Sequence, residues 1–250
     1  GIGTDDGRLS GLGNKPKAKN GVKLRAIRCH RGFDIIRSAA VTIATNIWGS
    51  LVDRLVADLV QHQDNCRAVL EFRELSDPAV LPGLKKYIEH PFWLVRWCIA
   101  DTLGNIEDPD SVQMLMGLLA SEDHHVRHNA KKALIRRWEM SLPLLFERLP
   151  TASSLERSRL IQVLDDMGAR AVPFFSEQLA HPDWMLANKS AELLGRIGGP
   201  LAVAGLCQGL QIDQVRKSCI VALGSLRDEA ALRFLNEIKN DPSLRQILAV

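Results

Sequence analysis

Residues 95–104 read VRWCIADTLG, and the same pattern returns as VRHNAKKALI at residues 126–135 and as VRKSCIVALG at residues 215–224. Each copy begins with Val-Arg, places a small or apolar residue at its fifth position, and continues to a small residue followed by Leu. The apolar positions recur at i, i+4, i+7, i+8 and i+11, which is one stripe of an α-helix. A helix that recurs with the same stripe predicts a repeat protein.

Weaker copies of this helix lie around the three clear ones. One runs from Leu186 to Ile197, another, with its arginine displaced, from Leu155 to Met167, and a degenerate first copy ends near Leu75. Shorter apolar-periodic segments separate the copies, at residues 80–88, 112–119, 142–149, 172–179, 201–210 and 230–238. The pattern predicts about six helix-pair units of about 29–31 residues each, with Asp-Pro and His-Pro dipeptides at the turns.

The predicted fold is therefore all-α: an α-solenoid, or superhelix, of about six stacked helix-pair repeats. The aromatic content of 5%, with a single Tyr, disfavours a β-sandwich or barrel. We expect three parts along the chain. Residues 1–32 form a basic, glycine-rich leader that is flexible or held by a partner, residues 33–62 form capping helices broken near Gly49-Ser50, and residues 63–250 form the repeat solenoid.

The formal net charge of +3 is unevenly distributed, because residues 1–47 carry nine Lys/Arg against three Asp. The longest mostly apolar run, residues 39–47, is shorter than the ~20 residues of a membrane span. Five cysteines without a CxxC pair favour free thiols in a reducing compartment, so we expect a cytoplasmic protein. The chain begins without Met, and we expect a fragment or a processed form.

The Val-Arg helix that runs on to Ala-Leu-Gly, the Asp-Pro turns and the period of about 30 residues resemble the HEAT-repeat family, and within it the short phycobilin-lyase-type HEAT-like repeat. The resemblance covers about residues 49–250. It implies that the second helix of each repeat lines the concave surface of the solenoid. An enzymatic branch of the family is a di-iron hydroxylase whose ligands come as His-Glu dipeptides, and this sequence contains none. That activity is not expected.

The most basic stretch of the repeats is residues 124–137, which hold three His and five Lys/Arg with no acidic residue. Several of these side chains lie off the apolar stripe, and the resemblance places them inside the curve, where they would attract phosphates or an acidic protein. Trp97 stands at the same register position as His128 and is expected to be an exposed anchor. The predicted partner-binding residues are Trp97, His128, Lys131, Lys132, Asn188 and Lys217.

The sequence can also be searched for a metal site and a catalytic site. His124 and His128 are spaced i,i+4 and could share a metal, with Asp123 or a neighbouring repeat supplying a third ligand. The favoured interpretation is a solvated basic surface, because the same helix continues into five Lys/Arg. No defensible nucleophile is found, and Cys219 falls at a core position. We therefore predict no metal, no cofactor and no catalytic residue.

The recurring arginines and two of the tryptophans have structural interpretations. Arg96, Arg127 and Arg216 are predicted to pair with acidic residues or helix-end carbonyls of the adjoining repeat. Trp93 and Trp184 each follow His-Pro-x, so we expect both to pack one repeat on the next.

These features predict a non-enzymatic solenoid that binds another protein, one with an acidic surface, through its concave face. It would act as a scaffold, adaptor or assembly factor and as a member of a larger complex. One alternative is a phycobilin-lyase-like or other chaperone or lyase subunit that holds a tetrapyrrole-bearing protein. A second alternative is nucleic-acid binding through the leader and the patch at residues 124–137. The sequence does not identify the partner or the oligomeric state.

Overall fold

The computed structural model describes residues 30–61, 66–226, 231–233 and 236, with side chains from residue 46 onward. The chain divides into two units, residues 1–39 and 40–250, and the repeats lie in the second. Every regular element of the described part is a helix. The fold is an α-solenoid, as the sequence predicts. None of the described helices combines the length and the apolar character that a membrane span requires.

Each repeat consists of a companion helix followed by a helix that carries the Val-Arg pattern, here called the motif helix. The motif helices are α2 (Cys66–Glu74), α4 (Trp93–Leu103), α6 (His124–Arg136), α8 (Ser154–Met167), α10 (Trp184–Ile197) and α12 (Arg216–Ser225). The companions are α3 (Leu81–Lys85) after the 3-10 turn η1 (Pro78–Val80), α5 (Pro109–Leu118), α7 (Trp138–Arg148), α9 (Val172–Gln178) after η2 (Gly168–Ala171), and α11 (Gly199–Gly209). The companion expected at residues 230–238 lies largely outside the described residues.

The helices begin where short polar side chains can accept backbone N–H groups. Asp77, Asp108, Asp123 and Asp183 each cap the N-terminus of the element that follows. Ser153 and Glu156 form a capping box at α8. Each cap satisfies donors that have no partner inside the helix, and its loss typically costs about 1 kcal/mol. The turns are therefore specified locally by the sequence.

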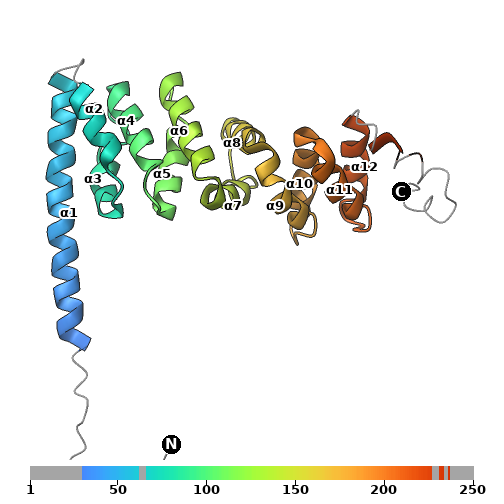
Figure 1. Ribbon diagram of the computed structural model, residues 1–250, viewed down its shortest axis with the longest axis horizontal. Coiled ribbons are helices and arrows are strands. Elements are labelled where there is room, and N and C mark those ends of the chain that lie inside the picture. The colour runs from blue at the N-terminus through green and yellow to red at the C-terminus, as the bar shows by residue number, and fades with distance from the viewer. Residues whose placement is uncertain (1–29, 62–65, 227–230, 234–235, 237–250) are drawn as a thin grey trace, which may run out of the picture. The chain divides into compact units, whose positions relative to one another are not determined.

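Stacked motif helices form one continuous core. Each motif helix packs against the next, α2 on α4, α4 on α6, α6 on α8, α8 on α10 and α10 on α12. Figure 1 shows α2, α4 and α6 following one another along one side of the array and α3 and α5 along the other. The predicted stripe is buried: Val95, Ile99, Leu103 and Ile106 in the second repeat, and Val126, Ala130 and Leu134 in the third.

Glycine allows the closest approach between motif helices. A Cβ atom at Gly104 would lie 2.8 Å from the Cβ of Ala133, and a Cβ atom at Gly195 would lie 2.8 Å from the Cβ of Ala222. Real Cβ atoms do not approach so closely, so a larger residue at either position would push the two helices apart. The Ala-Leu-Gly end of the pattern is thus a packing signature between one repeat and the next.

The recurring arginines clamp the turn inside their own repeat. One guanidinium nitrogen of Arg96 donates to the carbonyl oxygens of His90 and Pro91, the latter at 3.0 Å. Arg127 donates to the carbonyls of Ser121, at 2.8 Å, and Glu122. The prediction of carbonyl contacts is confirmed, but the carbonyls belong to the turn before the arginine's own helix rather than to the adjoining repeat. A long side chain at the start of a helix reaches this turn first.

Arg157 takes the same role in α8 and corrects the sequence alignment of that copy. Its guanidinium donates to the carbonyls of Leu149, at 3.0 Å, and Ala152, at 2.9 Å. The arginine of this repeat is therefore in register rather than displaced. Leu155, which began the predicted stripe, is instead exposed.

Ion pairs link successive motif helices beside the core. Asp101 of α4 lies between Arg73 of α2, at 2.7 Å, and Arg136 of α6, at 3.5 Å. Farther along, Asp165 of α8 pairs with Arg196 of α10. The Asp101 side chain is only 10% exposed, so its two pairs are better shielded than ordinary surface salt bridges.

Helix α1 (His30–Gln61) precedes the repeats. It continues through Gly49-Ser50, where the sequence predicted a break. A Cβ atom at Gly83 of α3 would lie 3.3 Å from the Cα of Gly49, so Gly49 lets α3 pack closely against the continuous helix α1. Four of its apolar side chains enter the core beside the first repeat: Val52, Leu55, Val56 and Leu59. Residues 1–29 lie outside the described residues, and the interpretation of the leader stays a prediction.

The close approach at Gly195 leads to a stability prediction. Gly195→Ala should lower the free energy of unfolding by about 1–3 kcal/mol, because the new methyl group overlaps Ala222. Gly117→Ala in α5 is the matched control, since a Cβ atom there meets nothing within 4 Å and the substitution should be neutral or stabilising by up to about 1 kcal/mol. Urea unfolding followed by circular dichroism measures both. Equal stability of the two variants would contradict the packing role.

Candidate functional site

A basic groove lies between α6 and α8. Its basic residues are His124, Arg127, His128, Lys131 and Arg159, and its volume is about 280 Å³. The first four come from one face of α6, whereas Arg159 is the sixth residue of α8, the next motif helix. The structure therefore brings His128 and Lys131 together, as the sequence predicts, and leaves Lys132 exposed beside them.

Backbone carbonyls hold two of the groove's cations. Arg127 is fixed by the turn carbonyls described above, and Arg159 donates to the carbonyl of Leu119, at 2.6 Å, just past the end of α5. Carbonyl oxygens orient a guanidinium without cancelling its charge. Among the described residues, neither arginine has a carboxylate within ion-pair distance. Both side chains therefore keep their positive charge available to a ligand.

An acidic side chain of α8 pairs with a lysine of the groove's lining. Asp166 of α8 accepts a 2.7 Å hydrogen bond from Lys131, whose side chain is 22% exposed. The pKa of His128 is lowered by desolvation and then by the positive fields of Lys132, Lys131, His124 and His125. These effects disfavour the protonated form of His128 in the free protein. A bound anion would offset these neighbouring charges and favour its protonated form.

An apolar groove of about 480 Å³ lies between α10 and α12 and contains two more of the predicted residues, Asn188 and Lys217. Its exposed apolar side chains are Trp184, Met185 and Val221, which are 64%, 40% and 71% exposed. This groove was not predicted from the sequence. The signal for it is Val221, because the equivalent position in the four preceding motif helices is polar: Asp101, Lys132, Gln162 and Glu192.

The two tryptophans that follow His-Pro-x differ in their surroundings. The ring of Trp93 lies 5.5 Å from the ring of His125 in the next repeat. In the repeat that follows Trp184, the position equivalent to His125 is Gln214. Its amide donates to the carbonyl of His181 at 3.1 Å. The expectation that Trp184 packs against the next repeat is wrong, because no ring is present there to cover it.

Trp97, expected to be an exposed anchor, is half-buried. The guanidinium of Arg73 lies 5.7 Å from its ring centroid, and Asn129 donates to its backbone carbonyl at 3.0 Å. It lines neither groove. The preceding repeat supplies the covering arginine, which sequence periodicity alone did not indicate.

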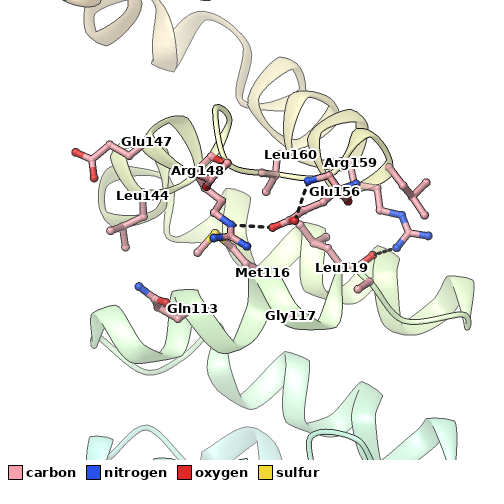
Figure 2. A pocket seen from close by; sticks show the side chains of 14 residues that line it. Gln113, Met116, Gly117, Leu119, Leu144, Glu147, Arg148, Glu156, Arg159 and Leu160 are labelled. Carbon is pink, nitrogen blue, oxygen red and sulfur yellow. Dashed lines mark hydrogen bonds and ion pairs between the residues drawn. The ribbon is translucent and has the colours of Figure 1, made fainter. Parts of the chain in front are cut away.

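A larger and more polar pocket, of about 670 Å³, lies between α5, α7 and α8. Figure 2 shows Arg148 of α7 pointing to Glu156 of α8, with which it forms a 2.9 Å ion pair, and Arg159 reaching Leu119. Arg148 and Glu156 neutralise each other, so the charges of this pocket that have no ion-pair partner among the described residues are Glu147 and Arg159, which have opposite signs. Its lining residues come from three helices and share no motif, so the sequence contained no signal for it.

Asp123, Cys98 and Cys219 each occupy a structural position in the described residues. No group of three or more His, Cys, Asp and Glu side chains there is placed to hold a metal ion. Asp123, considered as a third ligand, accepts the backbone N–H groups of His125 and Val126 as the helix cap. Burial raises the pKa of the Cys98 thiol to about 12, with a further increase from Asp101, and burial likewise raises the pKa of Cys219 to about 12.

Comparisons with known proteins agree with the architecture. A family model described as HEAT repeats matches residues 51–135, which run from α1 through most of α6. This part of the chain is therefore similar to HEAT repeats. The match does not test the short phycobilin-lyase type, which stays a prediction. A search of curated proteins found no match.

Similar solved structures were also found. The structure of human deoxyhypusine hydroxylase in complex with glycerol is 18% identical, covers 82% of this chain and 94% of its own, and has a TM-score of 0.32. The crystal structure of an engineered protein is also 18% identical, covers 70% of this chain and 96% of its own, and has a TM-score of 0.29.

Thiol burial leads to a reactivity prediction. At pH 8 a pKa of about 12 leaves about one thiolate in 10⁴, and the thiolate is the reacting form, so Cys98 and Cys219 should resist iodoacetamide in the folded protein. Exposed Cys66 is the internal control and should be alkylated first. Peptide mapping by mass spectrometry measures each site separately. Labelling of Cys98 or Cys219 as fast as Cys66 would contradict their burial.

Proposed function

We propose that this protein is a non-enzymatic binding solenoid, a scaffold, adaptor or assembly factor, that holds an acidic segment of a partner protein in the basic groove between α6 and α8. HEAT-repeat arrays generally bind other proteins along their extended surfaces. We also infer that the repeats are of the short phycobilin-lyase type, on the strength of their period of about 30 residues. The observation that supports the binding proposal most directly is a cluster of cations oriented by carbonyl oxygens.

Preorganisation makes this groove a better anion site than an ordinary basic surface. The side chains of Arg127 and Arg159 are already held by backbone hydrogen bonds, so binding would cost less side-chain entropy. Planar guanidinium groups match the geometry of a carboxylate, which can accept two parallel hydrogen bonds. The nearby Lys131 and Lys132 would add attraction over longer range.

A protein partner fits this face better than a nucleic acid. The motif helices also present Asp165, Asp166 and Glu192, which would repel a continuous phosphate backbone. Exposed Trp184 and Val221 are typical of surfaces that bind protein, where aromatic and aliphatic side chains serve as anchors. The basic leader is outside the described residues, so its part in nucleic-acid binding stays a separate prediction.

The proposal predicts a charge-dependent affinity for an acidic peptide. Replacing His128, Lys131 and Lys132 together by Ala should weaken binding of a fluorescein-labelled oligoglutamate peptide by about tenfold or more. Asp166→Asn is the matched control: it breaks the same Lys131–Asp166 pair but removes a negative charge, so the peptide should bind more tightly. Fluorescence anisotropy measures both affinities.

Two results would contradict the proposal. The first is equal affinity of the triple variant and the native protein for oligoglutamate. The second is a clear preference for a single-stranded oligonucleotide, with a steep linear fall of log affinity against log salt that depends on residues 1–32. Circular dichroism of each variant checks that the helical fold is retained.

A further inference from the structure

We infer that the partner segment carries a bulky apolar side chain beside its acidic residues, and that the apolar groove between α10 and α12 receives it. This inference rests on the proposed function and extends it to the chemistry of the partner. The occupant is an extended acidic segment with one apolar anchor. The anchor site consists of Trp184, Met185 and Val221, the exposed apolar side chains of the groove.

The apolar side chains are unusual for their positions. Val221 is 71% exposed where the four preceding motif helices carry polar residues, and Trp184 is 64% exposed where its equivalent Trp93 packs on a histidine ring. Repeat packing requires neither side chain. Neighbouring exposed apolar residues on two adjacent helices are typical of interaction surfaces.

Hydrogen bonds hold the walls of this groove in place. Ser218 of α12 donates to the side-chain oxygen of Asn188 in α10 at 2.6 Å, and the Asn188 amide donates to the carbonyl of Trp184 at 2.8 Å. The predicted residue Asn188 thus links the two helices through its side chain. A groove that is already formed requires little rearrangement to accept a side chain.

Charge favours an acidic segment over a neutral one. On the groove's rim, Lys189 pairs with Glu192, and Arg196 pairs with Asp165. Lys217 is exposed, and in the described part of the chain no carboxylate pairs with it. The rim therefore keeps a net positive charge of the same sign as the basic groove. A segment that is acidic along its length would be complementary to both.

One partner segment would have to reach both grooves. They open between motif helices of the same array, two repeats apart, and packed helices are typically 8–10 Å apart, which gives about 16–20 Å. An extended chain spans about 3.3 Å per residue, so about six residues would connect an acidic cluster to an apolar anchor. This spacing defines the probe.

Three fluorescein-labelled peptides test the inference by anisotropy. The first joins a glutamate run through a Gly-Ser spacer of about six residues to Leu-Phe, the second is the glutamate run with the spacer, and the third is the spacer with Leu-Phe. Native protein should bind the first peptide at least about tenfold more tightly than the second. Trp184→Ala and Val221→Ser should each remove most of this advantage and leave affinity for the second peptide unchanged.

Leu201→Ser on companion helix α11 is the matched control, because Leu201 is 65% exposed but lies outside the groove. It should bind all three peptides like the native protein. Both groove substitutions are at exposed positions, and unchanged thermal unfolding would show that the fold is intact. Binding should also shift native tryptophan emission to shorter wavelength, and Trp184→Phe should abolish the shift.

The outcomes separate the inference from the proposed function. If the anchored peptide binds no better than the plain acidic one, or if Trp184→Ala and Val221→Ser keep the full advantage, the anchor site is overturned while acidic binding stands. If a second copy of this chain occupies the groove instead, sedimentation would show a native dimer that Trp184→Ala converts to a monomer. That result would also overturn the inference. Loss of the proposed function would appear separately, as acidic binding that ignores His128, Lys131 and Lys132.

Discussion

The close packing of one motif helix on the next is the constraint on which the rest of the structure depends. No single helix pair can bury its apolar stripe, so each repeat is stable only against its neighbours. Gly104 against Ala133 and Gly195 against Ala222 allow close approach between motif helices. The arginine clamps stabilise the turn before the helix, and ion pairs such as Asp101 with Arg73 add a polar contact between stacked helices.

Because of this packing, different faces of the same helix have different roles. The stripe and the Ala-Leu-Gly end are committed to the core, whereas positions such as those of His128 and Val221 face outward and are free to vary. Grooves form between adjacent motif helices because two convex helices meet along a line. The chemistry of each groove then depends on its own outward residues: cations between α6 and α8, apolar side chains between α10 and α12.

Trp97 and Trp184 show where the assignments made from the sequence failed. Trp97 was assigned to the binding face because polar residues occupy its position in other copies, yet Arg73 of the preceding repeat covers its ring. Trp184 was assigned to packing because it follows His-Pro like Trp93, yet the next repeat offers Gln214 rather than a histidine ring. Whether each ring is covered depends on a side chain of the neighbouring repeat, and a pattern shared by all repeats does not identify that side chain.

The sequence by itself determined the all-α solenoid, the helix pairs, the buried stripe and the caps, because these follow from local periodicity and from side chains that bond within a few residues. It also placed His128 and Lys131 on one outward face. Only the tertiary structure decided that Arg159 joins them, that Asn188 and Lys217 line a groove with Trp184 and Val221, and that α1 runs through Gly49. Such contacts join residues about 30 or more positions apart, and their geometry is set by the stacking of whole repeats.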